Sequence, residues 1–307
     1  MRPVKQSALF RLALLALIWG SSFLWIKLAD RDFAPVEVTF ARLALGAAAL
    51  FPVVAARREA LPRSVALWAQ IALAALFANA IPYLLFAVAE QSVDSSTAGI
   101  INATTPLWTV TLALAVRHQK SVTARQCAGL VVGFAGTLLI FSPWHSASSV
   151  ASVGGLECLA ASISYAISYV YMDKFLARRG MSPITVSACQ LLVAAVLLTV
   201  ALPLSGAGAP QVSASSLASL VILGVLGTGV AYVLNYQIIT SEGATVAATV
   251  TYLLPVVAIV LGVVALGETV TITVLAGIAL VLGGVALTRR RSRQPRSDEI
   301  GPAGTSK

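Results

Sequence analysis

Residues 83–106 read YLLFAVAEQSVDSSTAGIINATTP, and residues 232–255 read YVLNYQIITSEGATVAATVTYLLP. The two segments align without a gap at an offset of 149 positions, so that Tyr83 meets Tyr232 and Pro106 meets Pro255. Each has the pattern of the end of an apolar helix, a short turn, and a second apolar helix that contains a proline. A duplicated helical hairpin in an apolar chain is typical of membrane transporters built from two repeats.

The amino-acid composition indicates that this chain is embedded in lipid. Of its 307 residues, 58% are hydrophobic and 11% are charged, and the mean hydropathy is +0.88. A soluble domain carries roughly 25% charged residues, so this chain has too few polar residues to cover a water-facing globule. The net charge of +9 could suggest nucleic acid as a partner. The basic residues lie between long apolar blocks, however, which favours membrane orientation instead.

Ten segments are long and apolar enough to cross a bilayer, which takes about 20 helical residues. They are residues 8–29, 34–56, 65–89, 95–116, 122–142, 153–174, 183–204, 215–240, 244–266 and 271–288. The connections between them are short and leave no room for a soluble domain. The sequence therefore predicts an all-α integral membrane protein with ten transmembrane helices.

The basic residues also predict the orientation of these helices. If the N-terminus is cytoplasmic, 18 of the 21 lysines and arginines fall on the cytoplasmic side, as the positive-inside rule requires. Lys27 and Arg31 fall outside, and Arg42 lies within the second span. Both termini are then cytoplasmic. Because each half has five spans, the second half enters the membrane upside down, which predicts two inverted five-helix repeats.

These predictions divide the chain into five parts. The parts are a cytoplasmic N-terminus (1–7), a first repeat (8–142), a linker (143–152), a second repeat (153–288) and a basic cytoplasmic tail (289–307) that we expect to be disordered.

Polar side chains near the middle of a span are the candidates for a binding site, because they are costly in lipid unless they face a cavity or each other. Asn79 and Tyr83 share one face of the third span, and the eighth span carries Thr228, Tyr232 and Asn235 in the same way. The remaining candidates are Trp19 and Ser22 in the first span, Asn102 in the fourth, Tyr165 and Tyr169 in the sixth, and Tyr252 in the ninth. The alternative is that these groups only bond neighbouring helices.

Two prolines and two charged residues add further expectations. Pro106 and Pro255 each remove a backbone N–H, and we expect them to kink the fourth and ninth spans. Arg42 is interpreted as a structural arginine that reaches toward loop carbonyls or Glu37 rather than as a substrate ligand. The sequence places no acid or histidine near mid-membrane, so Glu157, near the end of a span, is the first candidate for a coupling group.

Other classes of protein find no support in the sequence. Cys127, Cys158 and Cys189 lie inside apolar blocks without a metal-binding spacing, so we expect neither a metal nor another cofactor. No HExxH motif and no serine with a basic partner occurs, so an enzyme is not expected.

Five stretches carry a resemblance to a known family. They are LLALIWGSSFLWIK (14–27), FARLALGAAAL (40–50), AGIINATTPLWTVTLAL (98–114), ATVTYLLPVVAIVLGVVALGETVT (248–271) and AGIALVLGGVAL (276–287). In their order and spacing the chain resembles the EamA-like exporters of the drug/metabolite transporter superfamily. The resemblance implies two inverted five-helix repeats and alternating access through a cavity lined by spans 1, 3, 4, 6, 8 and 9. One departure is that the family's Leu-Gly-Glu, present at residues 266–268, is replaced after the fourth span by Arg117-His118-Gln119.

The resemblance implies a secondary transporter in the cell membrane, with the lipid bilayer and a small-molecule substrate as partners and without need of an oligomer. The first span has no glutamate and no span interior has a lysine, which disfavours the quaternary cations and sugar phosphates that other branches of the superfamily carry. A neutral or zwitterionic solute fits the Trp, Tyr and Asn side chains, with an aromatic or apolar amino acid as the first candidate for export. A carrier for drugs or toxic compounds and a channel-like passive facilitator stay open as alternatives.

Overall fold

The computed structural model describes residues 4–89, 92–93, 95–119, 121–142, 152–177, 179–200, 202–205, 212–266 and 271–288. All regular structure in these residues is helical, which confirms the predicted all-α class. The basic tail (289–307) and all of the linker except Ser152 lie outside the described residues.

The first half of the chain supplies the helices up to residue 142. They are α1 (Val4–Ala29), α2 (Pro35–Ala56), α3 (Val65–Ala75), the π-helical η1 (Leu76–Ala80), α4 (Ile81–Ala89), α5 (Ser95–Asn102), α6 (Thr105–Ala115) and α7 (Ala124–Phe141). The elements α3, η1 and α4 form one continuous span, Val65–Ala89.

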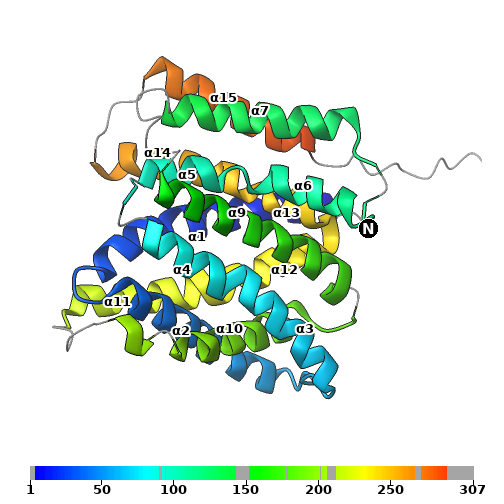
Figure 1. The fold of residues 1–307 in the computed structure, drawn as a ribbon, viewed down its shortest axis with the longest axis vertical. Helices are drawn as coiled ribbons and strands as arrows, with labels where there is room; N and C mark the ends of the chain where they lie inside the picture. Colours follow the sequence, from blue (N-terminus) through cyan, green and yellow to red (C-terminus); the bar gives the residue numbers. More distant parts are fainter. Residues whose placement is uncertain are drawn as a thin grey trace, which may run out of the picture.

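The second half follows the same order. Its elements are α9 (Val153–Tyr171), the π-helical η3 (Met172–Leu176), α10 (Pro183–Thr199), the 3₁₀ turn η4 (Leu202–Ser205), α11 (Ala214–Gly224), the π-helical η5 (Val225–Val230), α12 (Ala231–Glu242), α13 (Ala244–Ala248), α14 (Val250–Leu266) and α15 (Ile272–Thr288). In Figure 1 the helices form one bundle, with α7 and α15 at one edge and α2, α3 and α10 at the other.

Eight helical segments of the described residues are long and apolar enough to cross a membrane. The predicted spans 183–204 and 271–288 correspond to shorter apolar helices, Pro183–Thr199 and Ile272–Thr288, of 17 residues each. At 1.5 Å per residue such a helix is about 25 Å long, at the lower limit of a membrane span. The count of ten spans therefore stays a prediction.

Serine or threonine residues form the N-caps of several of these helices. The hydroxyl groups of Ser64, Thr123, Ser152, Ser182 and Ser213 each accept a bond from a backbone N–H in the first turn of the following helix. Such N-caps satisfy donors that have no partner within the helix, which explains why these helices start where they do.

The third and eighth spans contain an irregularity that the sequence analysis did not predict. The π-helical segment η1 begins at Leu76 and η5 begins at Val225, so the two lie at the same repeat offset of 149 positions as Tyr83 and Tyr232. In η5 the hydroxyl of Thr228 donates to the carbonyl of Leu223, five residues earlier, at 3.0 Å, which fits the wider turn. Asn79 lies within η1 and Thr228 within η5, while Tyr83 and Tyr232 follow in α4 and α12.

The fourth span is interrupted at Ala103 and Thr104, just before Pro106. Helix α5 ends at Asn102, and α6 begins at Thr105 with Pro106 in its first turn, where a missing N–H costs no helical hydrogen bond. In the ninth span the break lies at Thr249, between α13 and α14, while Pro255 lies inside α14. When the two hairpins are aligned, the interruptions of their second helices therefore lie about one helical turn apart.

Helices α7 and α15 pack through glycines from both halves of the chain (Figure 1). A Cβ at Gly136 would lie 2.7 Å from the carbonyl oxygen of Gly277, and a Cβ at Gly284 would lie 2.4 Å from the backbone nitrogen of Gly133. The helix backbones approach so closely because no side chain separates them. The GxxxG of Gly129 and Gly133 is therefore used within the molecule.

Candidate functional site

A pocket of about 360 Å³ lies in the middle of the bundle, between the two halves of the chain. This volume is within the roughly 300–1,000 Å³ of small-molecule sites. Its walls come from α1, α2, η1, α4, α5, α9, η3, α12 and α14. The resemblance implied a cavity between spans 1, 3, 4, 6, 8 and 9, and the structure adds α2 to these. Asp30 and Pro35 place one end of the pocket at the turn between α1 and α2.

Aromatic rings form much of the pocket wall. The ring of Phe86 stacks on Tyr165 at a centroid distance of 6.1 Å, and Tyr83 meets Tyr165 edge to face at 6.5 Å. On the opposite side the indole of Trp19 meets Tyr232 edge to face at 6.1 Å. Such contacts hold large rings in defined positions, and the rings present flat apolar surfaces to the cavity.

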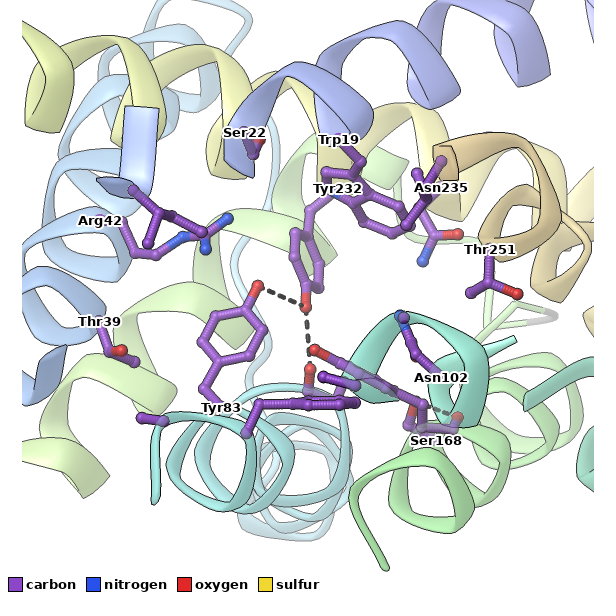
Figure 2. Close-up of a pocket in the computed structure, with 18 of the residues that line it drawn as sticks. Trp19, Ser22, Thr39, Arg42, Tyr83, Asn102, Ser168, Tyr232, Asn235 and Thr251 are labelled. Atoms are coloured by element: carbon purple, nitrogen blue, oxygen red, sulfur yellow. Dashed lines mark hydrogen bonds between the residues drawn. The ribbon is translucent and has the colours of Figure 1, made fainter. Parts of the chain in front are cut away.

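A chain of buried polar side chains supports the pocket from behind. The Asn79 amide donates to the Tyr232 hydroxyl at 2.6 Å, and the Gln190 amide donates to the oxygen of Asn79 at 2.8 Å. The Tyr236 hydroxyl in turn donates to Gln190 at 2.9 Å. The Tyr232 hydroxyl also lies 3.5 Å from that of Tyr83 (Figure 2). The predicted polar faces of the third and eighth spans thus touch directly at this level, and the pocket opens beside their contact.

Arg42 lies in the pocket wall and does not reach toward a loop. Its Nε donates to the Thr228 hydroxyl at 2.9 Å, its Nη2 lies 3.5 Å from the Gly227 carbonyl oxygen, and its guanidinium lies 4.9 Å from the centre of the Tyr83 ring. Glu37 instead accepts the backbone N–H of Ala34 at the start of α2. The expectation that Arg42 pairs with Glu37 or with loop carbonyls was wrong, because the π-helical turn of η5 brings its acceptors within reach of the guanidinium.

Most of the predicted site residues line this pocket. They are Trp19, Ser22, Tyr83, Asn102, Tyr165, Tyr169, Tyr232 and Asn235, and most of them are visible in Figure 2. Their role in binding a substrate stays a prediction.

Three predicted site residues lie outside the pocket. Asn79 and Thr228 are fully buried and bonded to other helices. Tyr252 is also fully buried, against Gly133, and its hydroxyl donates to the Leu130 carbonyl oxygen at 3.2 Å. The structure therefore places these groups in helix contacts, which was the alternative interpretation. Glu157 lies in the second turn of α9 and is not among the residues that line the pocket.

Several residues that surround or support the pocket were missed in the sequence. Thr39 and Asp30 lie in its wall, and Gln190 lies behind it. Gln190 is a lone amide in the apolar segment 183–204, so the rule that polar groups inside a span are costly was sufficient to find it. Asp30 carried no such signal, because it follows α1 in an ordinary charged turn.

Asp30 and Arg42 are, among the described residues, the pocket residues that carry a formal charge at neutral pH. Partial burial raises the pKa of the Asp30 carboxyl to about 6, because the protein replaces water that would solvate the charge. The same described residues contain no cluster of three potential metal ligands.

The two ends of the bundle are joined by different carboxylates. At one end Asp173, in η3, lies 3.0 Å from His118 Nε2 and accepts the backbone N–H of Ala244 at 3.1 Å. At the other end Asp32 accepts the backbone N–H of Ser213 at 2.9 Å. His118 belongs to the stretch Arg117-His118-Gln119, which replaces the family's Leu-Gly-Glu. This replacement therefore places a side chain of the first half in contact with Asp173 of the second half.

The described fold is that of a multi-pass membrane protein with an internal small-molecule pocket. Comparison with known families identifies the family directly. The EamA-like transporter family matches the chain twice, at residues 6–142 and 153–290. The chain belongs to this family, which confirms the resemblance, and the two matches cover the two halves of the chain.

Individual relatives agree with this assignment. An uncharacterized transporter of Archaeoglobus fulgidus is 25% identical over 287 residues, which cover 91% of this chain and 98% of the relative. The uncharacterized inner membrane transporter YedA of Escherichia coli K12 is 26% identical over 84% of this chain and 82% of its own length. A solved crystal structure covers 92% of this chain and 96% of its own at a TM-score of 0.74 and 21% identity, which shows a shared fold.

Proposed function

We propose that this protein is a secondary transporter of small metabolites that works as an exporter by alternating access, with neutral or aromatic amino acids as the first candidates. The observation that carries the proposal is the aromatic pocket of about 360 Å³ between the two halves of the chain. A site between two repeats can be opened to either face when one half rocks against the other.

The proposed membrane topology has ten spans in two inverted repeats with both termini in the cytoplasm. The repeat offset of 149 positions is supported by the equivalent placement of η1 and η5. With this topology the turn between α1 and α2 faces the outside, so the pocket described above reaches the outer face. The opposite end, with Asp173 and His118, then lies at the cytoplasmic face.

Saturable exchange is the test of this proposal. The purified protein is reconstituted into liposomes, and each batch is preloaded with one unlabelled amino acid from a panel. If that amino acid is a substrate, the preloaded liposomes should take up its labelled form faster than empty liposomes do. A passive channel should show no such counterflow. Tyr83→Ala and Tyr232→Ala should abolish it for the transported solute, since both rings lie in the pocket wall. Full counterflow in both variants would show that the pocket is not the transport site.

A further inference from the structure

The pocket contains a cation that has no anionic partner among the residues that the structure describes. Arg42 is 9% exposed, and among the described residues no carboxylate forms an ion pair with it. Its contacts are a hydroxyl, a carbonyl oxygen and the face of a tyrosine ring. These neutral partners orient the guanidinium but do not neutralise its charge.

An uncompensated charge at this depth is costly, and proteins in membranes normally pair such a group. In Figure 2 the guanidinium of Arg42 points into the cavity, toward the space between Tyr83 and Tyr232. The bonds to Thr228 and Gly227 engage Nε and Nη2, which leaves guanidinium N–H groups available to a bound group. Arginine binds carboxylates through two parallel N–H groups, and such charge-assisted bonds are strong.

We propose that Arg42 binds the carboxylate of the transported solute, so that the pocket selects an organic molecule with a single carboxylate and an aromatic or apolar body. This inference deepens the proposed function and rests on it. The aromatic walls favour the apolar body. The second charged group of the pocket, Asp30, disfavours solutes with several negative charges, because like charges repel.

Asn235 supplies a second recognition point. Its side chain lines the pocket and is 2% exposed, and its Oδ1 has no hydrogen-bond partner in the described part of the chain. A buried acceptor without a partner is costly, and a donor of the solute would satisfy it. Figure 2 places Arg42 and Asn235 on opposite sides of Tyr232, so the solute carries its carboxylate and this donor at separate positions.

Binding of matched probes to the purified protein tests the inference. The pairs are phenylpropionate with phenylpropionamide, and L-tryptophan with L-tryptophanamide, and in each pair a neutral amide replaces the carboxylate. In calorimetric titrations each carboxylate should bind at least about tenfold more tightly than its amide. Arg42→Gln should remove this preference and Arg42→Lys should keep part of it. Lys27→Gln is the control, because Lys27 does not line the pocket.

The comparison also separates the two recognition points. Asn235→Leu should weaken the binding of L-tryptophan, which carries N–H donors, and leave phenylpropionate unchanged. If both amides bind as tightly as their carboxylates, or neither carboxylate binds, the inference is wrong. The same holds if Arg42→Gln binds phenylpropionate as the unmodified protein does. Absence of saturable counterflow for every solute would instead refute the proposed function.

Discussion

At the scale of single residues, Gln190 shows how a side chain outside the pocket can define it. Its side-chain N–H donates a hydrogen bond to the oxygen of Asn79, and its side-chain oxygen accepts a hydrogen bond from the hydroxyl of Tyr236. Asn79 in turn holds the hydroxyl of Tyr232, which lies in the pocket wall. The position of the Tyr232 ring thus depends on α10, a helix that does not line the pocket.

The Gln190→Leu variant tests this dependence. The substitution leaves the oxygen of Asn79 and the hydroxyl of Tyr236 without partners, and we expect it to lower the stability by about 1–2 kcal/mol. Gln70→Leu is a matched control, because the side-chain oxygen of Gln70 has no partner in the described residues. Thermal unfolding in detergent should show a lower midpoint for Gln190→Leu only. Equal midpoints for the two variants would contradict the role of Gln190.

Asp30 predicts a pH dependence of binding. The pKa of its carboxyl is raised to about 6 by burial, so the group is neutral at lower pH and negative at higher pH. A negative Asp30 repels an anionic ligand at Arg42, and we expect phenylpropionate to bind a few-fold more weakly at about pH 7 than at about pH 5.5. The Asp30→Asn variant should bind equally at both values, and a persistent pH dependence in it would assign the effect to another group.

The sequence indicated the aromatic and amide residues of the pocket because such groups are rare inside apolar spans. It could not distinguish groups that face the cavity from groups that bond another helix. Asn79 and Asn235 are both amides at mid-span, yet the first is bonded to other helices, whereas the second lines the pocket and its oxygen has no partner in the described residues. Only the rotation of each helix about its axis separates these cases, and π-helical turns change that rotation.

At the scale of helices, the close pair α7 and α15 joins the two halves of the chain. A Cβ at Gly136 would lie 2.7 Å from backbone atoms of Gly277 and Val281. A backbone cannot move aside as a flexible side chain can, so even a methyl group there must push the two helices apart. Gly283 in the same α15 has open space around it.

This contrast gives a prediction with an internal control. Gly136→Ala should destabilise the protein by about 1–3 kcal/mol through overpacking. Gly283→Ala should be neutral or stabilising by up to about 1 kcal/mol, because alanine is the better helix former. Unfolding in mixed micelles by increasing denaturing detergent would measure both variants. A stable Gly136→Ala variant would mean that the two helices are farther apart than described.

Helix boundaries followed from the sequence only where local chemistry fixes them. Apolar length indicates the spans, and serine or threonine N-caps explain the starts of α3, α7, α9 and α10. The sequence did not predict the break at Thr249, because the residues on both sides of it are all compatible with a continuous helix. The matched prolines suggested equivalent kinks, but the first hairpin is interrupted just before Pro106, whereas in the second Pro255 lies inside α14 and the break precedes that helix.

At the scale of the whole molecule, carboxylate contacts join opposite halves at both ends of the bundle. The Asp173 carboxylate contacts His118 of the first half and the start of α13 in the second. Asp32 of the first half caps α11 of the second, and hydrogen bonds from Ser213 lower the pKa of its carboxyl. The proposed alternating access requires that contacts between the two halves break and form in turn at the two ends.

The Asp173→Asn variant should therefore shift the balance between the two states. Asparagine keeps one acceptor for the backbone N–H of Ala244 but replaces the carboxylate that lies against His118 with a neutral amide. This change weakens the contact, so we expect the Asp173 end to open more often. A cysteine that replaces Ala87, a residue of the pocket wall, in a protein without Cys127, Cys158 and Cys189 reports this change. In oriented vesicles its labelling by an impermeant maleimide should become slower from the end with Asp30 and faster from the end with Asp173.

Asp32→Asn, at the opposite end, is the control and should not accelerate labelling from the Asp173 end. Unchanged rates in Asp173→Asn would mean that this contact does not hold the pocket closed.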